Sequence, residues 1–208
     1  MSDYFDYKKT QILQNSKLEY DENVEAGLRM LTSAFSLQTA PCPCIESFAL
    51  YKSIHLPEVV ETYQSSSGVF DIAVYQIRYA WQEGGGTYSR LRYRRFFLAL
   101  LSLKTQYPRT AIFKESFLTK INDWFTRADV DIEAQAEFSK KFYVVSTDKT
   151  KLQLLISNRP LDGLAAYPEM EAEIYDNYCL FKVSTNPASE GEAQEMIELA
   201  EKLYRAFN

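Results

Sequence analysis

The chain has 208 residues, of which 46% are hydrophobic, 14% aromatic and 25% charged, and its net charge is −5. This composition excludes a disordered chain, because such chains lack the apolar and aromatic residues that build a core. The acidic balance also argues against binding to polyphosphates, unless a local basic patch overrides the average field.

The lengths of the apolar runs and the number of cysteines indicate the cellular compartment. The longest apolar run, over residues 96–103, is far shorter than the roughly 20 residues of a membrane-spanning helix. The first 20 residues lack the basic start and apolar stretch of a secretory signal. The three cysteines are an odd number, which argues against a disulfide framework. We therefore expect a cytoplasmic protein without membrane association.

The amino-terminal part is predicted to be helical. Apolar residues within 21–37 recur at spacings of three and four, which gathers them on one helical face: Val24, Leu28, Leu31 and Phe35. Gly27 weakens this helix, and Pro41 ends it. We expect one α+β domain over residues 1–208, with a helical subregion within residues 1–45.

The most informative segment is a predicted β-hairpin over about residues 70–103. Two runs rich in aromatic and β-branched residues flank Gly84-Gly85-Gly86, where the chain can reverse without Cβ clashes. The period-two alternation predicts an apolar inner face and a charged outer face. We place the following residues on the apolar face of the second strand, with Arg95 as its exception: Leu91, Tyr93, Phe97, Ala99, Leu101 and Leu103.

The strongest surface feature is a group of arginines with a nearby tyrosine, which we predict as ligand-binding residues: Tyr88, Arg90, Arg92 and Arg94. Alternate residues of a strand are about 7 Å apart, a spacing at which guanidinium groups can bind phosphates or carboxylates. Gln76 and Arg78 of the first strand fit the same polar face. The alternative interpretation is a solvated face whose arginines pair with acids or protect a sheet edge.

Shorter elements are expected on either side of the hairpin. Residues 58–61 fit a short helix or a strand equally well. Pro108 is expected to end the hairpin, before a short strand over residues 110–115. Helical spacing of apolar residues predicts a further helix over residues 117–125, and residues 142–146 are typical of a buried strand.

The carboxyl-terminal third carries the clearest local patterns. Asp148 is a plausible helix cap, and a short helix is expected over residues 160–166. Asp176 and Asn177 tolerate left-handed geometry, so we predict a second hairpin there. Ser189 and Glu192 form a capping box before an apolar stripe: Ala193, Met196, Ile197, Ala200, Leu203, Tyr204 and Phe207.

The usual signatures of chemistry are weak in this chain. A zinc site would need His55, the single histidine, together with all three cysteines, Cys42, Cys44 and Cys179. Asp129 and Asp131 supply only two ligands, and a turn or cap role suits them better. The glycine triplet precedes a strand rather than a helix, so it is no phosphate loop. We predict no catalytic residue, no metal site and no cofactor.

Part of the chain resembles a known family. The residues that carry the resemblance are an acidic turn, an aromatic strand with its cap, and the preceding hairpin: Asp129-Val130-Asp131, Phe138-Ser139, Phe142-Tyr143-Val144, Ser146-Thr147-Asp148, Asp71 and Pro108 to Phe113. Over about residues 69–207 the chain is similar to a family of uncharacterised bacterial proteins with a domain of unknown function. The resemblance implies a bacterial protein and a matching fold, and it implies no catalytic residues.

These observations predict an α+β fold, with an antiparallel sheet around the long hairpin and helices from the amino terminus, the middle and the carboxyl terminus. We expect a non-enzymatic protein-binding or scaffold module that uses a tyrosine-rich surface and the arginine face. The alternative is a binding protein for a small anionic ligand or nucleic acid through Arg90, Arg92 and Arg94.

Overall fold

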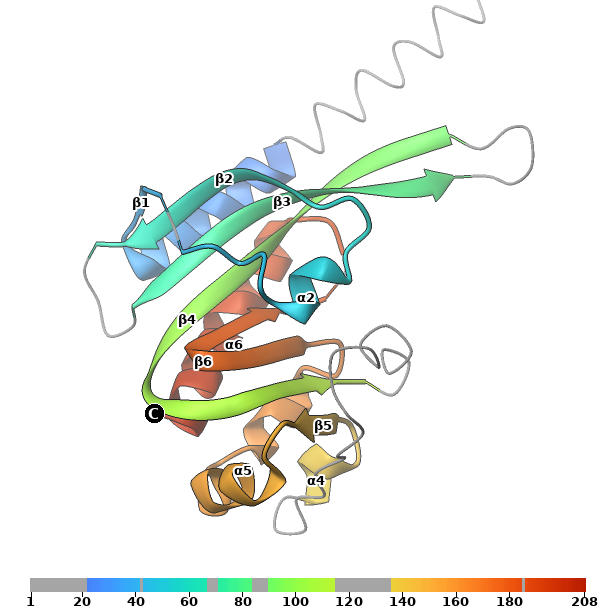
Figure 1. The fold of residues 1–208 in the computed structure, drawn as a ribbon. Helices are drawn as coiled ribbons and strands as arrows, with labels where there is room; N and C mark the ends of the chain where they lie inside the picture. The colour runs from blue at the N-terminus through green and yellow to red at the C-terminus, as the bar shows by residue number, and fades with distance from the viewer. Residues whose placement is uncertain (1–21, 42, 67–70, 84–89, 115–135, 185) are drawn as a thin grey trace, which may run out of the picture.

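The computed structural model describes residues 22–41, 43–66, 71–83, 90–114, 136–184 and 186–208. It has an α+β fold built on one antiparallel sheet (Figure 1). The described elements follow a helix over residues 22–35: β1 Leu37–Thr39, α2 Ala49–Lys52, β2 Glu58–Ser65, β3 Ile72–Glu83, β4 Arg90–Phe113, α4 Ala136–Ser139, β5 Tyr143–Ser146, α5 Lys149–Ile156, the 3-10 helix η3 Asp162–Ala166, β6 Glu171–Lys182 and α6 Glu190–Phe207.

The predicted central hairpin is present as β3 and β4. Its register runs without interruption from Ile72 opposite Leu101 to Glu83 opposite Arg90. In the described part of the chain the sheet order is β1-β2-β3-β4-β5, and β6 also pairs with β4. Residues 58–61, which fit a helix or a strand, belong to β2.

Strand β6 doubles back on itself at Asp176. A straight strand of this length would separate its two ends by about 36 Å. Lys182 Nζ nevertheless lies 2.8 Å from a carboxylate oxygen of Glu171, and Asp176 has a positive φ of 60°. Figure 1 shows the two arms of β6 side by side. The second hairpin predicted from Asp176 and Asn177 is therefore confirmed.

Strand β4 bends around the tip of β6. Its residues 99–102 pair with the second arm of β6 and residues 110–112 with the first arm, with register shifts between Ser102, Tyr107 and Thr110. The Gln106 side chain donates a hydrogen bond to the Asp176 carboxylate at this tip. The expectation that Pro108 ends the hairpin is wrong, because β4 continues to Phe113. Proline is tolerated in a strand at such an irregularity, where it interrupts no regular ladder.

Both faces of the sheet are buried at its centre. The helix over residues 22–35, α5 and α6 cover one face, while α2 and residues 45–51 cover the other. The predicted division into one apolar and one charged face is therefore wrong for the central sheet. Neighbouring residues of β4 belong to opposite cores: Phe97, Ala99 and Leu101 to the first, and Phe96, Leu98 and Leu100 to the second.

The helices follow the sequence patterns closely. Val24, Leu31 and Phe35 are buried, as their spacing predicts. The side chain of Ser189 accepts a hydrogen bond from the backbone N–H of Glu192 at the start of α6, and Asp148 caps α5 in the same way. None of the helices in the described part of the chain has the length and apolar character that crossing a membrane requires.

Candidate protein-binding surface

The far end of the central hairpin projects beyond the helices (Figure 1). We call this end, residues 78–83 of β3 and 90–95 of β4, the hairpin arm. It contains five arginines and one glutamate, in a chain whose net charge is −5. The arm is therefore locally basic on an acidic protein. It attracts anionic partners more strongly than the rest of the surface does.

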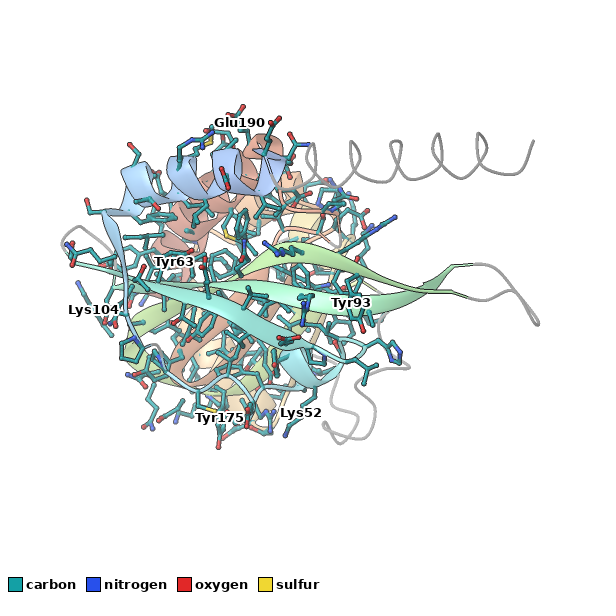
Figure 2. All side chains as sticks on the ribbon, turned by 90° about the horizontal axis from the view of Figure 1, so that it is seen from above. Lys52, Tyr63, Tyr93, Lys104, Tyr175 and Glu190 are labelled. Carbon is teal, nitrogen blue, oxygen red and sulfur yellow. The ribbon has the colours of Figure 1, made fainter. Side chains whose placement is uncertain are left out.

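The arm begins where burial ends along β4. Phe96 and Phe97 keep 5% and 3% of their surface exposed, whereas Tyr93 exposes 57%. Figure 2 shows Tyr93 at the place where the hairpin leaves the body of the molecule. An exposed aromatic ring next to arginines is a common feature of protein interfaces, because both residue types are enriched among binding hot spots.

Arg78 holds Tyr93 in place on one face of the arm. Its guanidinium carbon lies 5.3 Å from the centre of the Tyr93 ring, within the range of a cation–π contact. The Nε of Arg78 donates a hydrogen bond of 2.9 Å to Glu58 on β2, which completes an ion pair. Arg95 lies opposite Arg78 in the register. These contacts fix an aromatic ring and a charge in one orientation before any partner binds.

Exposed apolar side chains also lie near the arm, at the start of β2. The exposed residues Leu56, Val59 and Val60 lie where the chain enters β2. The backbone carbonyl of His55 accepts a hydrogen bond of 3.2 Å from the N–H of Ala80. This bond ties the entry segment to the edge of β3, so the three apolar side chains are close to the arm.

The predicted ligand-binding residues are only partly covered by the structure. Tyr88 lies outside the described residues, and Arg90 and Arg92 are placed by their backbone alone, opposite Glu83 and Trp81. Arg94 is partly buried and lies opposite Tyr79. The structure thus places Arg90, Arg92 and Arg94 on consecutive alternate positions of one strand.

Two details of the predicted polar face are wrong. Gln76 and Arg78 are opposite Phe97 and Arg95, so they lie on the other face from Arg94. Gln76 is also buried rather than solvated. The alternation in the sequence therefore did not identify Arg78 as the partner of Tyr93. The pairing of Glu83 with Arg90 places Arg78 opposite Arg95 and diagonal to Tyr93, whereas a reversal centred on the glycine triplet would have placed Arg78 opposite Arg92.

A second polar group lies inside the protein, beneath α2. Glu173 on β6 is 1% exposed, and its Oε2 accepts a hydrogen bond of 2.8 Å from the N–H of Leu50. Its Oε1 accepts one of 2.8 Å from Arg109 Nε, and Arg109 also donates to the carbonyl of Ser47 at 3.0 Å. Burial raises the pKa of the Glu173 carboxyl. The carboxylate is enclosed and hydrogen-bonded on both oxygens, so it anchors the α2 segment instead of presenting a reactive group.

The candidates for metal binding that the structure describes do not come together. Cys42, Asp129 and Asp131 lie outside the described residues, Cys44 is exposed, and Cys179 is buried in the sheet. Within the described ranges, no three histidine, cysteine, aspartate or glutamate side chains are grouped to hold a metal ion. Burial raises the pKa of the Cys179 thiol, which makes it a poor nucleophile.

The comparisons with known proteins found no relative of this chain. No protein-family model matches the chain, and no match was found among curated proteins or among solved structures. The resemblance to a bacterial family with a domain of unknown function therefore stays a prediction.

Proposed function

We propose that this protein is a non-enzymatic protein-binding module and that its partner binds the hairpin arm. The observation that carries the proposal is the exposed Tyr93 ring, oriented by Arg78 on a basic projection of an acidic molecule. Tyrosine and arginine supply much of the binding energy in protein interfaces. The cytoplasmic and bacterial setting remains part of this proposal.

A second candidate function is the binding of a small anion or nucleic acid through Arg90, Arg92 and Arg94. The local excess of arginine supports it, since guanidinium groups bind phosphates. The exposed Tyr93 ring favours a protein partner instead, because aromatic side chains are enriched at protein interfaces. A polyphosphate would also be repelled by the net charge of −5 of the whole protein.

The proposal is tested by site-specific photocrosslinking. A photoreactive amino acid replaces Val60, which lies beside the arm. In a separate control variant it replaces Thr62 on β2. Crosslinking is carried out in cells that express each variant. We expect a discrete protein adduct from position 60 that disappears when Tyr93→Ala is combined with it. The captured protein is then purified, and its affinity for wild type and Tyr93→Ala is measured by calorimetry.

The outcomes separate the two candidate functions. A purified partner that binds wild type and Tyr93→Ala equally well contradicts the proposed surface. A rise in melting temperature with inorganic phosphate, nucleotides or single-stranded DNA, lost in Arg94→Glu, supports the second candidate, since a specific ligand stabilises the folded state by mass action.

A further inference from the structure

We infer that the partner of the hairpin arm presents an extended segment in which acidic and apolar residues alternate, and that this segment adds a strand to the edge of β4. The inference rests on the proposed function, in which the arm binds a protein. It specifies the chemistry and the backbone conformation of that protein.

The outer edge of β4 has backbone groups that point away from β3. On this side β6 pairs with β4 only from Ala99 onward, and Ala188 donates its N–H to the carbonyl of Arg95 at 2.8 Å. Backbone groups of alternate residues in an antiparallel strand point to the same edge. The N–H and C=O groups of Tyr93 and Leu91 therefore point outward as those of Arg95 do. Among the described residues, no strand pairs with this stretch of the edge.

Strand addition is a common way in which proteins recognise peptides at such an edge. Hydrogen bonds between main chains supply affinity, and alternate side chains supply specificity. Residues 90–94 offer a short edge, which limits the added strand to about five residues at 3.3 Å per residue. A short contact of this kind suits a module that binds and releases its partner.

The order of residues along the edge defines the partner sequence. Arg90, Arg92 and Arg94 alternate with Leu91 and Tyr93. Residues that lie opposite each other on paired strands interact, and opposite charges stabilise while like charges repel. The complementary strand therefore has acidic residues opposite the arginines and apolar residues opposite Leu91 and Tyr93. Basic segments are excluded by repulsion.

The competing explanation is that the arginines only protect the edge from aggregation, as charged residues on many edge strands do. Tyr93 argues against it, because a purely protective edge gains nothing from a 57% exposed aromatic ring. The fixed Arg78–Tyr93 contact supports a binding role, since a preorganised side chain loses less entropy on binding.

Three fluorescent peptides test the inference by anisotropy at low ionic strength, where charge contacts are least screened. The first alternates glutamate and valine, the second has the same composition in two separate blocks, and the third is the alternating peptide with N-methyl groups on alternate residues. We expect the alternating peptide to bind about tenfold more tightly than the other two peptides. This difference in affinity corresponds to the binding energy of a single hot-spot residue.

Charge reversals on the protein provide the matched comparison. Arg92→Glu on the arm is expected to weaken binding of the alternating peptide about tenfold. Arg205→Glu changes the net charge by the same amount on α6, where the Arg205 side chain is 75% exposed, and is expected to leave binding unchanged. Circular dichroism of both variants confirms that they fold.

Each other outcome overturns part of the inference. Equal binding of the alternating and block peptides means that charge alone is recognised and that no strand is added. Equal losses in Arg92→Glu and Arg205→Glu place binding away from the arm. If none of the peptides binds, the acidic partner is wrong, while the crosslinking experiment at position 60 still decides the proposed function independently.

Discussion

The two ends of β4 have opposite surroundings. At the arm, β3 is the strand that pairs with β4 among the described residues, and Tyr93 is 57% exposed. At the other end, β4 has β5 on one edge and β6 on the other. There even charged side chains are buried, such as Glu173 and Lys182. Strands on both edges and segments over both faces therefore decide which side chains of a strand are exposed.

The buried charges at this end are paired, whereas the described arginine side chains of the arm, Arg78, Arg94 and Arg95, are only partly buried. Glu173 contacts Arg109, and Lys182 contacts Glu171 on the neighbouring arm of β6. A buried charge without a partner would be costly, whereas a solvated arginine costs little. We therefore expect substitutions at the β6 end to change stability and substitutions on the arm to change binding.

The largest expected effect comes from Glu173→Ala, which leaves Arg109 without its carboxylate and the N–H of Leu50 without its acceptor. Removing one partner of a buried ion pair destabilises a protein by about 3 kcal/mol. Urea denaturation at neutral pH measures the loss. The control is Glu169→Ala, whose partner Lys114 is near the surface and whose loss costs at most about 1 kcal/mol. Equal losses would contradict the role of Glu173 as an anchor.

The next effect concerns the close packing of the helix over residues 22–35. A Cβ added at Gly27 would lie 2.6 Å from the backbone oxygen of Ser189 and 3.1 Å from the Phe97 ring. We expect Gly27→Ala to destabilise the protein by at least about 1 kcal/mol, despite the better helix propensity of alanine.

Gly191→Ala in α6 is the matched control for Gly27→Ala. An added Cβ there is 3.8 Å from the nearest atom, an ordinary contact. Alanine in α6 should therefore be neutral or stabilising by about 0.5 to 1 kcal/mol. Thermal unfolding of both variants distinguishes the two sites. A higher melting temperature for Gly27→Ala would show that the helix can move away from Ser189.

A pH dependence is expected from Glu173. Its pKa lies above the ordinary value of 4.5 because desolvation outweighs the hydrogen bonds from Leu50 and Arg109. The folded protein keeps this proton at pH values where the unfolded chain has lost it. The free energy of unfolding therefore falls as pH rises from about 4.5 through the folded pKa, and the contribution is constant above it.

Glu173→Gln isolates this contribution because glutamine does not titrate. We expect the unfolding free energy of wild type, minus that of Glu173→Gln, to decrease with rising pH in this window and then to level off. Urea titrations at a series of pH values measure the difference. A difference that increases with pH would mean that the hydrogen bonds lower the pKa of Glu173 instead.

The smallest expected effect on stability comes from the arm. Tyr93→Ala should change the free energy of unfolding by less than about 0.5 kcal/mol, as for most surface substitutions. Phe96→Ala, three residues further along β4, removes a buried ring and should cost about 3 kcal/mol or more. Chemical denaturation compares the two. Similar losses would show that the arm is packed and not free to bind a partner.

Part of the fold could be predicted from the sequence because it depends on neighbours along the chain. The caps at Asp148 and Ser189 and the apolar stripe of α6 need only helical geometry. The turn at Asp176 needs only residues that tolerate left-handed conformations. The arginine cluster could be predicted for the same reason, because its members are close in sequence.

The tertiary structure alone decided which side chains are enclosed. Alternation marks two faces of β4, but the α2 segment covers the face that was expected to be charged. Arg78 meets Tyr93 and Glu58 through the register of three strands, and Glu173 meets Arg109 through the bends in β4 and β6. Such contacts join residues that are far apart in the chain, so no local pattern encodes them. They form only when the sheet and its coverings assemble together.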